Sequence, residues 1–197
     1  YSIPKNIDSA IEVINQEKTI AQDIGKITTE NKVNYFNNLA GLGFDGFVAK
    51  NLPRFKKWGG LSYFLSAIIS LFQYKSHDLI ITTEDKEIKS KTFLLAMGIC
   101  KFCGGGMRLT HEPNSTDGLL DVTIVQDLSP FSFLLHIMKM YNGKINNYKK
   151  VETFKTNKME VVLEEKYNLF IQVDGELIET NSFKVEVLPN AFSFVVK

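Results

Sequence analysis

Hydrophobic and polar residues alternate along much of this chain, and the alternation predicts strands. Successive side chains of a strand point to opposite faces, so period two indicates one buried side and one solvent-facing side. Two such runs stand near the N-terminus, at 19–28 and 32–40. Seven more follow residue 77, at 79–83, 86–97, 119–125, 153–163, 168–173, 182–188 and 191–196. The pattern therefore predicts a chain that is mainly β.

Helical spacing of apolar residues is confined to four segments. Ile7, Ala10, Ile11 and Ile14 fall on one face of a helix over 7–15. Three further helices are predicted at 47–55, 61–72 and 130–141. Many short strands with few helices are typical of a sandwich or an open barrel. We therefore predict the α+β class, mainly β: one domain built as a two-layer β-sandwich with a few helices packed at one side or end.

Composition narrows the class of protein. The chain has 197 residues, of which 44% are hydrophobic and 23% charged, enough for a folded core. A net charge of +1 argues against nucleic acid as a partner. Two cysteines do not form a disulfide framework, so we expect a reducing, cytoplasmic compartment. Because the chain begins with Tyr1, we expect a fragment, a processed product or a trimmed one.

Two Asp-Gly pairs, Asp117-Gly118 and Asp174-Gly175, stand between apolar runs. Such a pair is a strong hairpin signal, because Gly takes the positive φ of a tight turn. Further carboxylates, Asp121 and Glu176, follow them. On an extended strand residues 174 and 176 point to the same side, where they could bind Mg²⁺ or accept a hydroxyl proton. The alternative is that all four are solvated turn residues.

Glycine-rich and cysteine motifs leave other functions open. Residues 41–46 fit the G-x-G-x-x-G pattern, but the next strand comes too late for a Rossmann unit. This spacing favours a tight strand-to-helix turn in which Asp45 caps the helix. Residues 104–106 form a triple glycine that suits either a phosphate cradle or a bulge. Cys100 and Cys103 have no second pair of cysteines with which to bind a metal, so they are interpreted as small buried residues. His111 is close in sequence to Asp117 and could tune the electrostatics of that loop.

A basic, aromatic corner comes just before the apolar helix, at residues 54–58. Such a corner can rest on an anionic membrane surface with Trp58 at the headgroup level. The alternative is a solvated face of a nearly neutral protein. The longest apolar stretch, 61–72, is too short to span a membrane and contains three serines.

Taken in order, these blocks resemble the C-terminal domain of the diacylglycerol kinase-like lipid kinases, a superfamily that includes bacterial diacylglycerol kinases, sphingosine kinases and ceramide kinases. The resemblance runs over nearly the whole chain. It is carried by Ala10, Asp23 and Gly25, by the block Gly41, Gly43, Phe44, Asp45 and Val48, by Gly60, Leu61 and Tyr63, by residues 104–107, by residues 117–122, and by residues 173–176.

The resemblance implies the second domain of a two-domain, ATP-dependent lipid kinase, with residues 1–197 forming the β-sandwich and the ATP-binding domain absent. It implies that Asp117 binds Mg²⁺ with help from the carbonyls of Asn114 and Leu119, that Asp174 is the general base, and that Glu176 helps to place the catalytic Mg²⁺. ATP would bind largely on the missing domain, so we expect the isolated chain to be inactive. A lipid substrate and a transient, peripheral membrane contact are the implied partners, and a homodimer is left open.

Several residues depart from the family pattern. Ile99 and Cys100 replace the usual Asn and Gly, and His111 and Pro113 replace the usual Pro and Ala. The acidic residues are retained, and phosphoryl transfer needs metal ligands and a base rather than a nucleophilic side chain. Two alternatives remain: a related kinase acting on NAD, and a non-catalytic lipid-binding domain. The sequence does not name the lipid.

Overall fold

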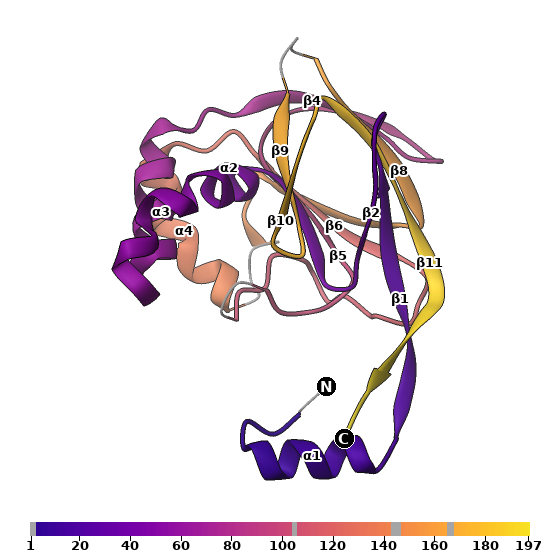
Figure 1. Ribbon diagram of the computed structural model, residues 1–197. Helices are drawn as coiled ribbons and strands as arrows, with labels where there is room; N and C mark the ends of the chain where they lie inside the picture. Colours follow the sequence, from indigo (N-terminus) through magenta and orange to yellow (C-terminus); the bar gives the residue numbers. More distant parts are fainter. Residues whose placement is uncertain (1–2, 104–105, 143–146, 165–167) are drawn as a thin grey trace.

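The computed structural model describes residues 3–103, 106–142, 147–164 and 168–197 (Figure 1). Its helices are α1 (Ile7–Asn15), α2 (Phe44–Asn51), α3 (Ser62–Gln73) and α4 (Pro130–Tyr141), with a 3₁₀ segment, η1 (Leu52–Leu61), between α2 and α3. Its strands are β1 (Thr19–Thr28), β2 (Val33–Phe36), β3 (Leu39–Gly43), β4 (His77–Thr82), β5 (Glu87–Gly98), β6 (Leu120–Gln126), β7 (Val151–Thr156), β8 (Lys158–Leu163), β9 (Leu169–Val173), β10 (Glu176–Thr180) and β11 (Ser182–Val195). The predicted α+β, mainly β class is confirmed.

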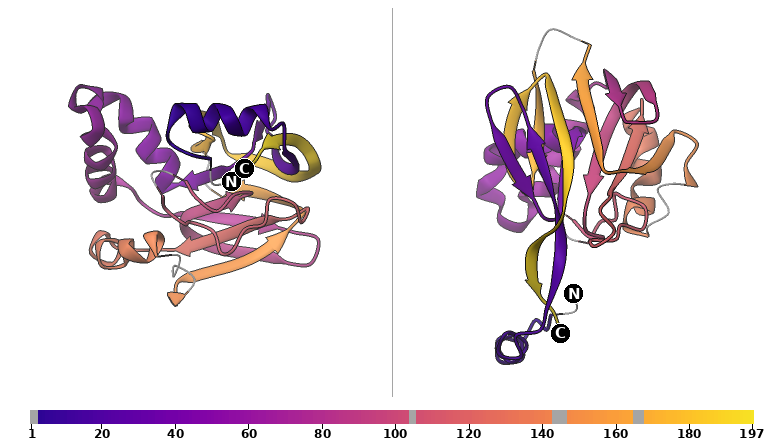
Figure 2. Two further views of the ribbon diagram at one scale, coloured as in Figure 1. Left: turned by 90° about the horizontal axis from the view of Figure 1, so that it is seen from below. Right: turned by 90° about the vertical axis from the view of Figure 1, so that its right-hand side faces the viewer.

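These strands form one curled antiparallel sheet. The order along it is β10-β9-β3-β5-β4-β8-β11-β1-β2, and β6 and β7 extend it from the other edge of β5. The curl places β1, β2, β8 and β11 opposite the layer around β5, β6 and β7, as the right-hand view of Figure 2 shows. The result is a β-sandwich-like domain, as predicted.

Two hydrophobic clusters hold the layers together. The first fills the space between the layers and includes Ile27 of β1, Val161 of β8, Leu95 of β5 and Ile124 of β6, each at most 1% exposed. The second lies between the outer face of β5 and β6 and the helices. Phe44 of α2 stacks on Phe93 at 4.8 Å between ring centroids and meets Phe133 of α4 edge-on at 5.1 Å. Both α2 and α4 are therefore fixed to the same side of the sheet.

The polar breaks in the predicted strands are points where the chain changes layers. The run predicted at 32–40 is two strands, because β2 pairs with β1 whereas β3 pairs with β5 and β9. The run at 153–163 divides in the same way at Asn157. In contrast, the runs at 182–188 and 191–196 form one strand, β11, which continues through an irregularity where Asn190 has a φ of 54°.

Other predictions hold or fail for local reasons. The bounds of α1, β1 and α4 are those predicted. The helix expected at 47–55 begins earlier, at Phe44, and passes into η1 at Leu52. The Asp117-Gly118 pair does not close a hairpin: it ends a long loop and leads into β6, which pairs with β5 and β7. Among the described residues, no helix is long and apolar enough to cross a membrane.

Helix α1 stands apart from the sandwich at the end of the long β1–β11 ribbon, next to both chain termini (Figures 1 and 2). Asn6 caps it, because the Asn6 side chain accepts a hydrogen bond from Ser9 N at 3.1 Å. Its apolar stripe is largely exposed, with Ile7 at 75%, Ile11 at 49% and Ile14 at 58%.

Candidate functional site

The turn between β9 and β10 is a tight hairpin turn built by Asp174 and Gly175. Both residues have positive φ, 45° and 96°, and Val173 pairs with Glu176 across the turn. Positive φ at both central positions is the feature of a type I′ turn, which Asp-Gly favours. The second of the two predicted hairpins is therefore confirmed. It presents the Asp174 carboxylate at the end of the sheet.

That carboxylate is bound by the backbone of the loop between β2 and β3. Asp174 Oδ2 accepts hydrogen bonds from Asn37 N at 2.7 Å and Asn38 N at 3.3 Å, and Oδ1 accepts one from Leu39 N at 2.9 Å. Asp174 N in turn donates to Leu39 O at 3.1 Å. A carboxylate has about four acceptor positions. Three are used by the loop, which leaves about one for a further donor.

The expectation that residues 174 and 176 share one side of an extended strand is wrong. Asp174 has left-handed backbone geometry inside the turn, and Glu176 is the first residue of β10. Glu176 is exposed and does not belong to the described residues that line the adjacent cavity. The structure thus separates the surroundings of these two carboxylates.

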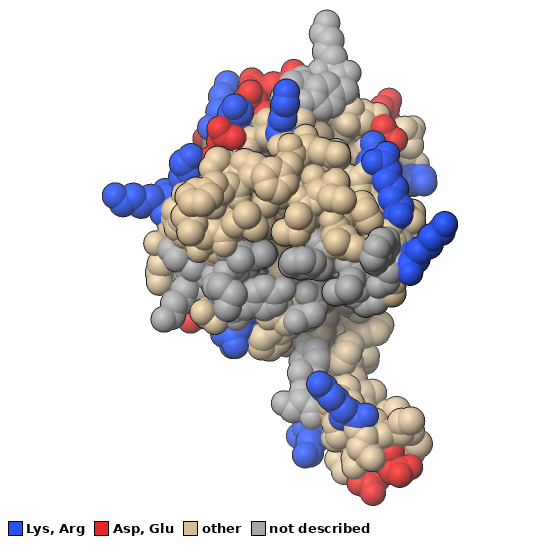
Figure 3. Space-filling model, turned by 90° about the vertical axis from the view of Figure 1, so that its left-hand side faces the viewer, with Lys and Arg blue, Asp and Glu red and all other residues tan. Residues whose placement is uncertain are grey.

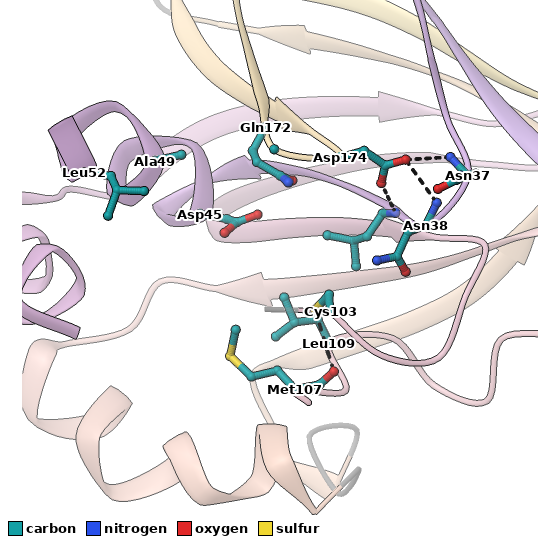
Figure 4. Close-up of a pocket in the computed structure, with 12 residues that line it drawn as sticks. Asn37, Asn38, Asp45, Ala49, Leu52, Cys103, Met107, Leu109, Gln172 and Asp174 are labelled. Atoms are coloured by element: carbon teal, nitrogen blue, oxygen red, sulfur yellow. Dashed lines mark hydrogen bonds between the residues drawn. The ribbon is translucent and has the colours of Figure 1, made fainter. Parts of the chain in front are cut away.

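A second carboxylate, Asp45 of α2, faces the same cavity as Asp174 (Figure 4). Gln172 of β9 links Asp45 to the turn residue next to Asp174. With its amide oriented to suit both neighbours, Gln172 donates to Asp45 Oδ2 at 3.3 Å and accepts from Gly175 N at 2.7 Å. The cavity has a volume of about 600 Å³. Its other walls are mostly apolar and are formed by Leu39, Ala49, Leu52, Cys103, Met107 and Leu109.

The glycines of the 41–46 motif are explained by close packing rather than by a dinucleotide. A Cβ at Gly41 would lie 2.4 Å from Asp45 Oδ2, and one at Gly46 would lie 1.9 Å from Phe170 O. Gly41 therefore admits the Asp45 side chain, and Gly46 lets α2 approach β9. Strand β3, which contains the first two glycines of the motif, pairs antiparallel on both edges, and this excludes a Rossmann unit. Asp45 does not cap α2 as expected, because the N-cap position is Gly43 and no side chain bonds there.

Cys103 lines the cavity as a free, partly buried thiol. Its Sγ donates to Met107 O at 3.7 Å. Burial, followed by the negative charge of Asp45, raises the pKa of the Cys103 thiol from 9.0 to about 11. Cys100 is also a free thiol, and its Sγ lies 3.2 Å from Asn37 O. A raised pKa of the Cys103 thiol is the opposite of what thiol redox chemistry requires. The predicted burial is met in part, because both cysteines are partly rather than fully buried.

The loop before β6 holds a separate group of charges. Lys155 Nζ of β7 lies 2.8 Å from Asp117 Oδ2 and 3.2 Å from Asp121 Oδ2. Asp121 is 3% exposed, and burial raises the pKa of its carboxyl group although Lys155 lowers it. The charge of His111 is the smallest of the influences that lower the pKa of the Asp121 carboxyl group.

A buried carboxylate that the sequence prediction did not single out as a site residue, Asp23 of β1, supports this loop. Its side chain is fully buried, and Oδ2 accepts from Gly118 N at 2.7 Å while Oδ1 accepts from Asn190 N at 2.8 Å. Asp23 N also donates to Ser115 O at 2.8 Å. One residue thus fixes both the Asp117-Gly118 turn and the irregularity in β11.

The donor set of the Asp117 loop fits Mg²⁺. Carboxylate and carbonyl oxygens are the ligands that this hard cation prefers, and Asp117, Asn114 and Leu119 carry them within six residues of the chain. Asp117 Oδ1 accepts from Leu119 N at 3.1 Å, which holds the turn closed. Lys155 already neutralises part of the charge, so an ion bound by Asp117 would share that carboxylate with Lys155. In the described part of the chain, no group of three or more His, Cys, Asp or Glu residues is placed to hold a metal.

The sequence singles out Asp174 and Asp117, whose roles stay predictions, but it does not indicate the contacts that Asp45, Gln172 and Asp23 make. The block at 41–48 was noticed for its glycines, and its acidic residue was interpreted as a cap. Gln172 precedes the hairpin by two residues and looks like an ordinary strand position. Gly104 and Gly105, weighed as a phosphate cradle, lie outside the described residues, as do the side chains of Lys56 and Trp58.

Known proteins share this sequence pattern and fold. The family model of the "YegS C-terminal NAD kinase beta sandwich-like domain" matches residues 38–196. The chain is 25% identical over 194 residues to the "Probable lipid kinase YegS-like" of Yersinia enterocolitica, covering 96% of this chain and 62% of that protein. It is 29% identical over 165 residues to a protein of the same name from Shewanella frigidimarina, covering 83% of this chain and 52% of that protein.

Solved structures agree at the level of the fold. A Bacillus anthracis protein assigned as a diacylglycerol kinase superposes with a TM-score of 0.75 at 21% identity, covering 99% of this chain and 62% of that one. A diacylglycerol kinase of the same bacterium superposes with a TM-score of 0.68 at 18% identity, over 99% of this chain and 60% of that one. The chain therefore spans between half and two thirds of the length of these relatives.

Proposed function

We propose that this chain, which belongs to the family of YegS C-terminal domains, is the lipid-binding half of an ATP- and Mg²⁺-dependent lipid kinase. The relatives named as lipid kinases support a kinase that acts on a lipid. The finer part of the proposal is the substrate: a hydroxyl group of diacylglycerol or of a similar lipid. In the relatives the matched region is only part of the protein, so we assign ATP binding largely to a further domain.

The observation that carries the proposal is the cavity between α2 and the β9–β10 turn. It combines two carboxylates, Asp45 and Asp174, with apolar walls that include Leu52 and Met107. A lipid with a polar hydroxyl needs both kinds of surface in one cavity. The arrangement suits an acyl chain against the apolar walls and the hydroxyl beside the carboxylates.

Asp174 is the base in this proposal. Phosphoryl transfer depends mainly on positioning and charge, and the protein must accept the hydroxyl proton. The Asn37–Leu39 backbone holds the Asp174 carboxylate by three N–H groups, which fixes its position. Asp174 lines the cavity, and its remaining acceptor position would take the proton of the lipid hydroxyl. Gln172 would keep Asp45 in place across the cavity.

Asp117, Asn114 and Leu119 would hold a Mg²⁺ ion, and Glu176 would help to position the catalytic one. Mg²⁺, when bound, neutralises phosphate charge during transfer. Asp23 supports this group indirectly by holding Gly118.

Product identity tests the proposal. The complete protein is incubated with radiolabelled ATP and Mg²⁺ in the presence of diacylglycerol, sphingosine or NAD, and the products are separated by thin-layer chromatography. We expect label in a phospholipid. Label in NADP would instead support the NAD kinase alternative, and binding of lipid without any labelled product would support a non-catalytic domain. This chain alone is expected to show no turnover, and turnover by it would contradict the assignment of ATP binding to a further domain.

A further inference from the structure

Helices α3 and α4 present large apolar side chains to solvent on one side of the molecule. Both helices are attached to the sheet through buried residues, Leu71 of α3 and Phe133 of α4, which belong to the same hydrophobic cluster. Their outer surfaces carry Phe72 at 68% exposure and Phe131 at 72%. We call the exposed apolar side chains of these two helices the helical face; it consists of Ile69, Phe72, Phe131, Leu134 and Leu135.

The two chain segments that carry the helical face contain charges of one sign only. The segments 46–77 and 128–151, which contain η1, α3 and α4, hold nine of the 23 basic residues of the chain and none of its 22 acidic residues. The exposed basic side chains in these two segments include Lys50, Arg54, Lys57, Lys75, Lys149 and Lys150. Figure 3 shows this side as a broad area without described charged side chains, with Lys and Arg, and some Asp and Glu, standing at its edges. The net charge of +1 therefore does not reveal that these two segments carry only positive charge.

We propose that the helical face docks on an anionic lipid surface. Exposed apolar side chains insert into the region between headgroups and acyl chains, and each Lys or Arg near the surface adds attraction to anionic lipid. A large exposed apolar patch in a folded protein marks an interaction site. The positive charge of the segments 46–77 and 128–151 favours an anionic partner.

A second copy of the chain fits this face less well. In a two-fold dimer the same surface meets itself, so the basic residues of one copy would approach those of the other. Because 46–77 and 128–151 contain no acidic residue, that interface would have no carboxylate from these segments to pair with them. An anionic bilayer supplies the missing negative charge.

Docking in this orientation would also place the cavity next to the membrane. Ala49 of α2 and Leu52 of η1 line the cavity, and both belong to the same acid-free segment as α3. A lipid leaving the bilayer would therefore reach Asp174 past apolar residues. This part rests on the proposed function, whereas docking itself requires only the exposed residues and their charge.

Vesicle co-sedimentation tests the proposal without ATP. The chain is mixed with vesicles of phosphatidylcholine alone or of equimolar phosphatidylcholine and phosphatidylglycerol, at low and at high salt. Two face variants are compared with the parent: Phe72→Ser/Phe131→Ser and Arg54→Glu/Lys57→Glu. Matched controls are Ile11→Ser on α1, whose side chain is also exposed, and Lys32→Glu in the β1–β2 turn. The charge variant keeps every core residue, so it remains informative if the double Phe variant folds poorly.

We expect binding to the vesicles that contain phosphatidylglycerol, a loss of about tenfold or more in affinity for each face variant, and no change for the controls. High salt should weaken vesicle binding by the parent and leave vesicle binding by the charge variant nearly unchanged. No binding to anionic vesicles, or equal binding by parent and face variants, would overturn the proposal. A parent dimer that the face variants convert to monomer would assign the face to self-association instead. Phosphorylation of a short-chain, soluble diacylglycerol by the complete protein tests the kinase function separately.

Discussion

The Asp23 carboxylate accepts a hydrogen bond from Gly118 N at 2.7 Å, across 95 positions of sequence. It does so while fully buried, with its other oxygen bound to Asn190 N. Buried carboxylates are stable only when their oxygens are satisfied. The turn that carries Asp117 is thus attached to the sandwich core by one side chain.

Replacing Asp23 with Asn should destabilise the protein by about 3 kcal/mol, because one N–H would then face an amide instead of a carboxylate oxygen. Urea denaturation measures the loss, and hydrogen exchange of the Gly118 amide shows whether the turn loosens. Asp85→Asn in an exposed turn is the matched control and should change stability by less than about 0.5 kcal/mol. Equal effects of both variants would contradict the anchoring role of Asp23.

Lys155→Met should also destabilise the protein, by about 2 kcal/mol, because it leaves the buried Asp121 carboxylate without its cation. The added variant Asp121→Asn should recover part of the loss, since no unpaired charge then remains. Chemical denaturation of the single and double variants gives the coupling energy.

The control for this ion pair is Lys89→Met. Lys89 lies 3.6 Å from Glu87 in an exposed pair, which should contribute less than about 0.5 kcal/mol. If Lys155→Met lowered the free energy of unfolding no more than Lys89→Met does, Lys155 would not be needed to stabilise the Asp117 and Asp121 carboxylates.

Cys103 provides a pH-dependent probe of the cavity. Its pKa of about 11 means that the thiolate, the reactive form, becomes abundant only as the pH rises through that value. In a Cys100→Ala background at neutral pH, iodoacetamide should react about 100-fold more slowly with the folded protein than with the urea-unfolded one. Asp45→Asn should lower the Cys103 pKa and speed the reaction, because a negative charge is removed.

The same shift has a consequence for stability. A thiol pKa that is raised in the folded state contributes stability below the unfolded value of 9.0, and that contribution is lost as the pH rises through about 11. Cys103→Ala should therefore reduce the loss of stability over this alkaline range. An alkylation rate that is the same in folded and unfolded protein would contradict the burial of this thiol beside Asp45.

The local sequence was sufficient to predict those elements that form without depending on which distant strand they pair with. The apolar spacing and Asn6 cap of α1, the alternation of β1 and the Asp174-Gly175 turn all depend on neighbouring residues, and all were found. The breaks at Asn37–Asn38 and at Asn157 could not be predicted, because they depend on which strand pairs with which layer. The first Asp-Gly pair was misinterpreted for the same reason: its flanks have no hairpin partner.

The candidate site shows the same limit. Asp174 was predicted from its turn and from the family resemblance, but its anchoring by Asn37 and Leu39 spans 135 or more residues. Asp45 joins the site only because Gly41 and Gly46 let α2 lie close to β3 and β9. Asp23 is buried beside Gln22, at a point where the register of β1 shifts, so simple alternation does not indicate its direction.

The cavity at Asp174 is, in this proposal, where a lipid hydroxyl is phosphorylated, and turnover by an Asp174→Asn variant of the complete protein tests this. Glu179→Gln, an exposed carboxylate of the same hairpin, is the control, and the melting temperature of both variants shows whether the Asn37–Leu39 loop still holds. We predict that Asp174→Asn lowers kcat by about 100-fold or more while Glu179→Gln leaves it unchanged. Parent-like turnover by a folded Asp174→Asn variant would contradict the claim.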